Sequence, residues 1–129
     1  MNDLLDTHIL LWILVDPDKV PRPMRRIVED TKNRVWFSAA SIWQVAIKHS
    51  WVKTEFAVEP STIWRAARNT GIEELAVTAE HAVGVDALPW LNRDSFDRLL
   101  VAQARAEGMK LLSVDPQVNA YLSRARHLR

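Results

Sequence analysis

Short apolar runs alternate along the chain with longer segments whose apolar residues have helical spacing, and this alternation constrains the fold more than any other feature. Apolar runs this short are typical of buried strands. Strands that alternate with helices form a parallel sheet covered by those helices. We therefore predict an α/β fold with a central parallel sheet of four to five short strands, flanked by helices on both faces. The predicted strands are Asp3–Leu5, Arg34–Phe37, Leu75–Val77 and Lys110–Val114.

Capping residues, prolines and glycines set the expected helix boundaries. The segment Val52–Glu59 shows no clear preference. The predicted helices are Thr7–Leu14, capped by Thr7; one opened by Pro21 and Pro23; Ala39–Ser50, capped by Ser38; one capped by Ser61 and ended by Gly71, with Trp64 and Ala67 inward; Ala79–Ala87; Ser95–Glu107, closed by Gly108; and one that begins at Pro116.

The composition, with 48% hydrophobic and 26% charged residues, is that of an ordinary globular protein, and we expect one domain over residues 1–129. The net charge of +1 identifies no partner, so any binding of nucleic acid must depend on local clusters. The absence of cysteine excludes disulfides and thiolate metal sites. The apolar run Ile9–Val15 is too short to span a bilayer, so we expect a cytoplasmic protein without a membrane partner.

Two aspartates directly follow predicted strands. Asp6 interrupts the apolar stretch LLDTHILLW, and Asp115 ends the stretch LLSVD. An ionised carboxylate among buried apolar residues is costly unless it is paired, hydrogen-bonded or bound to a metal. The carboxyl ends of parallel strands lie at one edge of the sheet, and open α/β sheets bind their ligands beyond this carboxyl edge. We expect both aspartates to lie there. Taken singly, each has an ordinary alternative as a turn or cap residue.

Further carboxylates come from the stretch NRDSFDRLLVAQARAEG, where Asp97 lies in the first turn of the predicted helix and Asp94 just before it. The ordinary alternative is that both cap the helix and complement its dipole. Together with Asp6 and Asp115, however, Asp97 would suffer mutual repulsion unless a cation lay between the three carboxylates. Oxygen ligands without histidine or cysteine favour Mg²⁺ or Mn²⁺ over zinc. We therefore predict a carboxylate metal site of the kind that hydrolyses phosphodiesters.

At this point the sequence resembles the PIN domain family, and more narrowly the VapC-like toxins of bacterial toxin–antitoxin pairs. The resemblance covers nearly the whole chain and is carried by LLDTHILLW, SAASIWQVAIK, RDSFDRLLVAQA and LLSVD, in that order. It implies a compact α/β domain that cuts RNA with Mg²⁺ or Mn²⁺ held by a cluster of acids. The implied products carry 5′-phosphate and 3′-hydroxyl ends. The implied partners are an RNA substrate, a cognate antitoxin that silences the toxin, and a second copy of the chain in a homodimer.

The resemblance also implies roles for individual residues. Asp6, Asp97 and Asp115 match the first, third and fourth acids of the family and would hold the metal. Asp94 matches an additional acid, and either Asp94 or Asp97 would orient the attacking water. The supporting residues are Thr7, Ser38 and Ser113, the last of which matches a hydroxyl beside the final acid.

One position departs from the family pattern, because Gln44 stands where a glutamate is usual. Glutamine offers a neutral oxygen but no charge, and it cannot act as a base. One alternative function is therefore that of a catalytically weakened PIN-fold protein that binds RNA or antitoxin without cutting. A simpler interpretation is that Gln44 is a surface residue of its helix.

Positive and aromatic side chains could serve RNA binding. Lys48 stands one turn from Gln44 and could reach a phosphate. The ordinary interpretation of each basic cluster is a solvated face. The clusters are Arg22, Arg25 and Arg26; Arg65 and Arg68; and the tail Arg124, Arg126, His127 and Arg129. Core or subunit contacts are expected of Trp12, Trp43 and Trp64, and base stacking is open to Trp51 or Trp90.

A receiver-type signalling domain also gathers acids at one edge of a sheet. It would need a phosphoacceptor aspartate after a strand in the middle of the chain and a lysine near the end of the last strand. Ser38 and Thr78 follow the middle strands here, and the last strand ends at Asp115. The positions therefore exclude this class.

Overall fold

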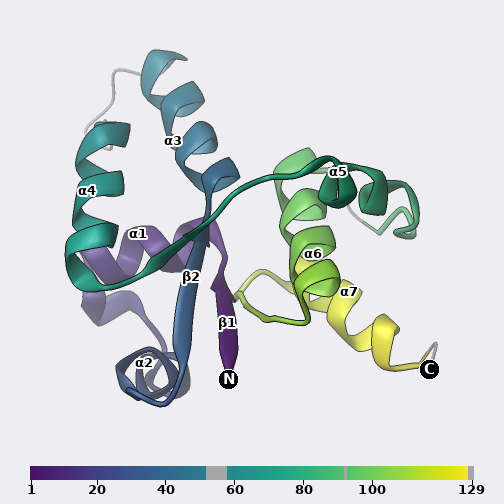
Figure 1. Cartoon of the computed structure of the whole chain (residues 1–129), viewed down its shortest axis with the longest axis horizontal. Helices are drawn as coiled ribbons and strands as arrows, with labels where there is room; N and C mark the ends of the chain where they lie inside the picture. The colour runs from purple at the N-terminus through teal and green to yellow at the C-terminus, as the bar shows by residue number, and fades with distance from the viewer. Residues whose placement is uncertain (52–57, 92, 128–129) are drawn as a thin grey trace.

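A parallel sheet lies at the centre of the computed structural model, which describes residues 1–51, 58–91 and 93–127 (Figure 1). The strands lie side by side in the order β3-β2-β1-β4, and each neighbouring pair is parallel. The predicted parallel α/β sheet is confirmed. In chain order the elements are β1 (Asn2–Leu5), α1 (Thr7–Val15), the 3₁₀ helix η1 (Pro17–Lys19), α2 (Arg22–Glu29), β2 (Arg34–Ser38), α3 (Ala39–Trp51), α4 (Pro60–Thr70), β3 (Glu73–Leu75), α5 (Ala79–Asp86), α6 (Ser95–Glu107), β4 (Lys110–Leu112) and α7 (Pro116–His127).

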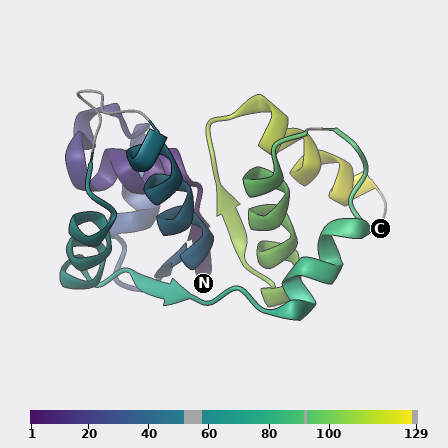
Figure 2. The same cartoon turned by 90° about the horizontal axis from the view of Figure 1, so that it is seen from above.

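Two hydrophobic clusters cover the two faces of the sheet. Leu4 packs with residues of α6 and α7 such as Leu100 and Val118, whereas Leu5 packs with residues of α1 and α4 such as Ile9. Successive side chains of a strand point to opposite faces, so α5, α6 and α7 cover one face and α1, α2 and α4 cover the other. Figure 2 shows the two groups of helices on either side of the strands. Helices on both faces were predicted, and this is confirmed.

Strand β3 begins and ends two residues earlier than the predicted range Leu75–Val77. Gly71, in the left-handed conformation with φ of 88°, ends α4 and turns the chain directly into the strand. Leu75 pairs with Ser38, the last residue of β2. Beyond Ser38 the neighbouring strand offers no further ladder partners, so Ala76 and Val77 do not extend β3.

The same reason shortens β4, which was predicted to reach Val114. Leu112 pairs with Leu5, the last residue of β1, and the ladder ends there. Ser113 and Val114 therefore lie beyond the sheet rather than in it. Helix α6, by contrast, has the predicted bounds and ends at Gly108, which has a φ of 65°.

Two predictions for α4 were wrong. The helix begins at Pro60, and Ser61 lies inside its first turn with its hydroxyl donating to Glu59 Oε1 at 3.0 Å. Trp64 was predicted to face inward but is 37% exposed, because its indole N–H donates to Glu74 Oε1 on β3 at 2.9 Å. Ala67 is fully buried, as predicted. Most of the undecided segment Val52–Glu59 falls on residues 52–57, outside the described residues.

Strand β1 contains a buried carboxylate that the sequence did not single out. Asp3 is fully buried, and neither of its carboxylate oxygens has a hydrogen-bond partner among the described residues. Burial raises the pKa of Asp3, while the positive charges of Lys110 and the N-terminal amine partly oppose that rise. Since an ionised carboxylate is poorly solvated there, it lowers the stability of the fold at neutral pH.

We expect Asp3→Asn to stabilise the protein by about 1–2 kcal/mol at pH 7, because the variant removes a charge that folding takes out of water. A raised pKa means that the folded state keeps its proton to higher pH than the unfolded state. The free energy of unfolding of the native protein should therefore fall as pH rises from the ordinary aspartate range through the raised pKa.

Urea unfolding of both proteins between pH 4 and pH 8 measures this difference. The gain in stability of Asp3→Asn should shrink toward pH 4, where Asp3 is increasingly protonated in both states. A gain that did not vary with pH would show that the charge of Asp3 is not the cause.

Among the described residues, no helix has the length and apolar character needed to cross a membrane.

Candidate active site

Asp6 lies at the junction of β1 and α1, where it is nearly buried at 3% exposure. Its Oδ1 accepts the backbone N–H of Thr7 at 2.7 Å, and its Oδ2 accepts the hydroxyl of Ser113 at 2.6 Å. Its own N–H donates to Leu112 O at 3.0 Å, which holds the residue beside the end of β4. The N-cap of α1 is therefore Asp6. The prediction that Thr7 caps this helix was wrong.

Ser113 connects Asp6 with Asp115. The buried Ser113 hydroxyl donates to Asp6 and accepts the backbone N–H of Asp115 at 3.0 Å. Asp115 Oδ1 accepts the N–H of Gln117 at 2.9 Å, so this carboxylate also stabilises the start of α7. β1 and β4 are adjacent parallel strands, and the residues after their carboxyl ends are thus linked by hydrogen bonds. The structure brings together Asp6, Ser113 and Asp115.

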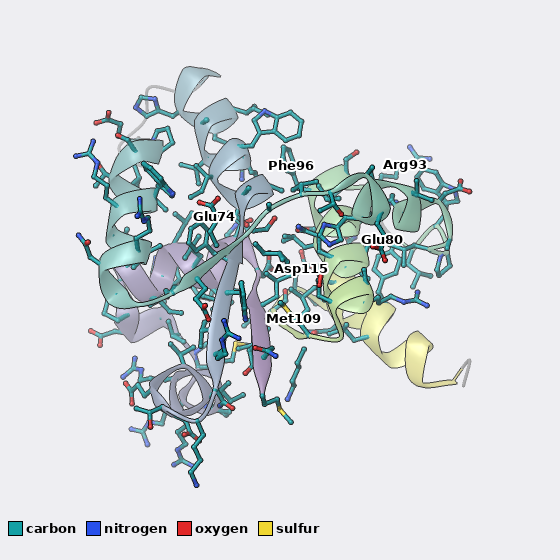
Figure 3. The ribbon with its side chains drawn as sticks, viewed as in Figure 1. Glu74, Glu80, Arg93, Phe96, Met109 and Asp115 are labelled. Carbon is teal, nitrogen blue, oxygen red and sulfur yellow. The ribbon has the colours of Figure 1, made fainter. Side chains whose placement is uncertain are left out.

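Asp94 and Asp97 belong to the start of α6. Asp94 Oδ1 accepts the N–H groups of Phe96 at 2.9 Å and Asp97 at 3.1 Å, which is the capping role considered from the sequence. The helix ends at Gly108 and β4 starts at Lys110, so the last turn of α6 lies at the amino end of β4. Because α6 packs along the sheet, its first turn lies toward the carboxyl edge, on the side of Asp6 and Asp115. Figure 3 shows the labelled Phe96 at the upper end of α6.

Gln44 is not a surface residue, because it is only 8% exposed. The interpretation of Gln44 as an ordinary surface position is therefore wrong. Among the described residues its side-chain amide has no hydrogen-bond partner. Thr7 and Ser41 share a hydrogen bond of 2.8 Å between their hydroxyls, which fixes the start of α1 against the start of α3. The buried Gln44 amide thus lies on a helix anchored to the segment that carries Asp6.

Ser38 accepts the N–H of Ala40 at 3.0 Å, as expected of a residue that caps α3. It also donates to Gln103 Oε1 on α6 at 2.6 Å, a contact that the sequence did not predict. Gln103 is fully buried and lies 3.4 Å from Nδ1 of the buried His81, whose Nε2 is 2.9 Å from Glu107 Oε1. This polar network ties the end of β2 to α5 and α6. A polar residue inside the apolar run LLVAQA was the signal that could have revealed it.

The side chains available for a metal at this edge carry only oxygen donors, which suits Mg²⁺ or Mn²⁺. In the part of the chain that the structure describes, however, no three His, Asp or Glu side chains stand close enough to hold an ion as a group. The donor chemistry fits a hard divalent ion. Binding of an ion by three carboxylates would require their side chains to move closer to one another. Like charges repel, so the carboxylates are expected to come together only around a cation.

An apolar groove of about 630 Å³ runs between α1 and α3. The apolar residues that line it are Leu11, Trp12, Val15, Val45 and Val58. The polar residues that line it are His8, Lys19, Lys48 and His49, together with Asp16, which lies 3.6 Å from Lys19. Lys48 is exposed and stands one turn beyond Gln44, as predicted. The groove therefore combines apolar area with mainly basic groups.

The other basic clusters lie elsewhere. Figure 1 places α2, with Arg22, Arg25 and Arg26, at the end of the sheet near the N-terminus, opposite to the aspartates. Arg65 and Arg68 lie on α4, and the guanidinium of Arg68 stacks on Trp64 at 5.1 Å from the ring centroid. The side chains of the basic tail and of Trp51 lie outside the described residues. Trp90 is 79% exposed and stacks on Arg98 at 4.2 Å.

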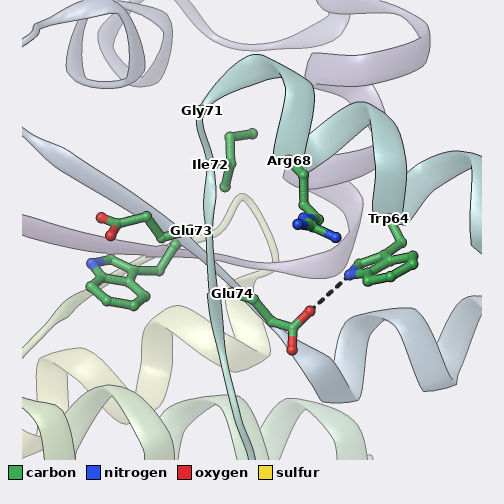
Figure 4. Close-up of a pocket in the computed structure, with 7 residues that line it drawn as sticks. Trp64, Arg68, Gly71, Ile72, Glu73 and Glu74 are labelled. Atoms are coloured by element: carbon green, nitrogen blue, oxygen red, sulfur yellow. Dashed lines mark hydrogen bonds between the residues drawn. The ribbon is translucent and has the colours of Figure 1, made fainter.

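A second hollow, of about 570 Å³, lies at the edge strand β3 (Figure 4). Its polar groups satisfy one another, since Glu74 accepts the indole N–H of Trp64 and Glu73 forms an ion pair with Arg34 at 2.6 Å. The hydrogen bonds from Arg34 lower the pKa of the Glu73 carboxyl. The pair is exposed and contributes little to stability. We find no reacting group in this hollow, so the carboxyl edge is the candidate active site.

Three comparisons with known proteins bear on this site. Residues 4–122 match the family model described as PIN domain. No curated protein matches the sequence. The crystal structure of VapBC2 from Rickettsia felis bound to a DNA fragment from their promoter contains a chain of similar fold, with a TM-score of 0.67 and 15% sequence identity over 94% of this chain and 93% of that chain. At this identity the likeness concerns the fold.

Proposed function

This chain belongs to the PIN domain family, and from that premise we propose that it is a metal-dependent ribonuclease of the VapC type. It hydrolyses RNA phosphodiester bonds and is silenced by a cognate antitoxin. The observation that carries the proposal is the hydrogen-bonded link from Asp6 through Ser113 to Asp115 at the carboxyl edge of the sheet. Open parallel sheets bind their ligands at this edge.

Each residue at the edge has a proposed role. Asp6, Asp97 and Asp115 would hold Mg²⁺ or Mn²⁺, and Gln44 would contribute a neutral oxygen. When bound, such an ion supplies an activated water at neutral pH and neutralises charge on the phosphate. Ser113 fixes the orientation of the Asp6 carboxylate, and carboxylate oxygens retain further lone pairs after such a bond. Asp94 holds the start of α6, and Asp94 or Asp97 orients the attacking water.

An antitoxin partner is supported by two observations. The protein of similar fold was crystallised as VapBC2 with promoter DNA. The groove between α1 and α3 is lined by apolar side chains and by mainly basic polar ones, which suits an acidic amphipathic segment of another protein. We also propose that the active form is a homodimer.

A catalytically weakened protein is the second candidate function. The buried Gln44 places an uncharged group where the family usually has an acid. In this second function the protein binds RNA or antitoxin without cutting RNA. Its acidic side chains would then carry too little negative charge to bind a metal ion. The two functions differ in whether the native chain cuts RNA.

Cleavage of a structured RNA by the native protein and by Gln44→Glu tests the proposal. We expect native cleavage that requires Mg²⁺ or Mn²⁺ and stops with a chelator. We expect Gln44→Glu to bind Mn²⁺ about tenfold more tightly in a calorimetric titration and to cut faster, because it restores a charge. Unit charges about 4 Å apart interact by roughly 4 kcal/mol at an effective dielectric of about 20. Desolvation and repulsion offset most of this, and a remainder of about 1.4 kcal/mol is tenfold.

Asn69→Asp is the matched control, since it makes the same amide-to-acid change at an exposed position at the end of α4. It should bind Mn²⁺ as the native protein does. If neither the native protein nor Gln44→Glu cuts any RNA, the ribonuclease proposal fails and the non-catalytic function takes its place. If both cut equally, Gln44 is not part of the site.

A further inference from the structure

Two aromatic side chains meet beside the candidate active site. Trp43 on α3 contacts Phe96 in the first turn of α6, edge to face, with ring centroids 5.1 Å apart. Trp43 directly precedes Gln44, and Phe96 directly precedes Asp97. The pair therefore joins the two helices that carry these residues, and Figure 3 shows Phe96 between α3 and α6.

Trp43 remains 60% exposed despite this contact, although burial of a large ring is favourable. Trp64 and Trp90 are also exposed, but an arginine stacks on each of them. Trp64 in addition donates its indole N–H to Glu74. Among the described residues, no cation stacks on Trp43 and its indole N–H has no acceptor. Trp43 thus presents an uncovered aromatic surface that Phe96 supports from one side.

Resting on the proposed function, we propose that Trp43, supported by Phe96, stacks on an unpaired base of the RNA next to the bond that is cut. Every nucleobase has a flat π-face, so stacking tolerates any sequence. A base inside a duplex cannot offer that face, so this contact requires an unpaired nucleotide next to the bond that is cut.

The charges at the carboxyl edge favour this occupant. The aspartates of the site repel RNA phosphates, and the net charge of the chain is only +1. A contact that does not depend on charge would therefore add to affinity at this edge, and base stacking provides one. Contact with a second copy of the chain is the competing use of the same ring.

The test measures binding of a short single-stranded RNA labelled with a fluorophore, by anisotropy in a chelator so that no cleavage occurs. The proteins are the native chain, Trp43→Leu, Trp43→Phe and the control Trp64→Leu, which removes an exposed tryptophan of α4 at the edge strand β3. Stacking is worth about 1–3 kcal/mol per base, so we expect Trp43→Leu to weaken binding about tenfold. Trp43→Phe keeps an aromatic face and should stay within about threefold of the native protein, and Trp64→Leu should not change binding.

A second set of RNAs carries one abasic nucleotide at each position in turn. One abasic position should weaken binding to the native protein about tenfold and leave binding to Trp43→Leu nearly unchanged, because the two changes remove the same contact. Equal affinity of the native protein and Trp43→Leu would overturn the proposal. The proposal would also be overturned if Trp43→Leu and Trp43→Phe lost RNA affinity equally and light scattering showed a change from dimer to monomer. That result would identify Trp43 as a subunit contact.

These outcomes are separate from failure of the proposed function. If the native protein cuts RNA and Trp43→Leu binds RNA as tightly, only the stacking proposal fails. If the native protein neither binds nor cuts RNA, the ribonuclease proposal fails and the stacking proposal falls with it.

Discussion

Asp97→Asn is expected to lower the rate of RNA cleavage by at least about 100-fold while leaving the fold intact. Asp97 is an acid in the first turn of α6 and is proposed to hold the metal, and asparagine has nearly the same shape without the charge. Metal-assisted charge stabilisation is worth several kcal/mol in the transition state, and each 1.36 kcal/mol is tenfold in rate. Single-turnover cleavage of RNA in Mn²⁺ measures the loss.

The effect on stability separates catalysis from helix capping. Asp97 lies in the first turn of α6, where its charge is worth about 0.3–1 kcal/mol to the helix. Removal of one of the carboxylates proposed to hold the metal relieves whatever repulsion exists between them and opposes this loss. We therefore expect thermal unfolding in a chelator to change little. Marked destabilisation with unchanged cleavage would mean that Asp97 is a structural residue only.

Asp18→Asn is the matched control for this experiment. Asp18 is an exposed acid in the first turn of η1, so the variant removes the same kind of charge from the same kind of position away from the carboxyl edge. Its cleavage rate should equal that of the native protein. A similar loss in both variants would point to a general effect of net charge on RNA binding.

Arg98→Met is expected to destabilise the protein by about 3 kcal/mol, the largest effect on stability among these predictions. Arg98 is 4% exposed on α6, and its guanidinium donates to Pro89 O at 3.0 Å, Val85 O at 3.1 Å and the hydroxyl of Tyr121 at 2.9 Å. Methionine fills a similar volume but donates nothing. A hydrogen bond from a charged donor contributes about 1.5–3 kcal/mol. The loss is not larger because each acceptor also accepts a backbone N–H, from Leu91 for Pro89 O and the Tyr121 hydroxyl and from Leu88 for Val85 O.

Part of this penalty is offset, because the variant no longer has to take a charged guanidinium out of water. Among the described residues, Arg98 has no acidic partner that would compensate for that cost. The remaining loss should lower the Tm by roughly 10 °C for a domain of this size. Arg105→Met, an exposed change on the same helix, should lie within about 1 kcal/mol of the native protein. If Arg98→Met unfolds at the native temperature, the hydrogen bonds of Arg98 do not hold the loop before α6 in place.

The order and kind of the secondary structure could be predicted from the sequence. Helix α6 has the predicted bounds because a capping aspartate begins it and Gly108 ends it. The positions of Asp6 and Asp115 at one edge also followed from the sequence. A residue directly after a strand of a parallel sheet lies at the carboxyl edge wherever that strand is placed.

The ends of β3 and β4 could not be predicted, because a strand stops where its neighbour stops. Leu75 and Leu112 are the last residues with partners in β2 and β1, and those partners are distant in sequence. Local apolar character extended both strands too far. The position of Trp64 was missed for a similar reason, since its indole N–H finds an acceptor on another element.

The sequence by itself determined the α/β alternation, the carboxyl-edge placement of the aspartates after β1 and β4, and the motifs of the family. Only the tertiary structure decided which polar groups meet. The hydrogen bond from Ser113 to Asp6 joins residues 107 positions apart, and that from Ser38 to Gln103 joins residues 65 apart. Burial of Gln44 and exposure of Trp43, neighbours on one helix, likewise follow from how α3 packs. Hydrophobic periodicity in the sequence shows which face of a helix or strand is apolar. Which partner a polar side chain contacts depends on how elements distant in sequence pack against each other.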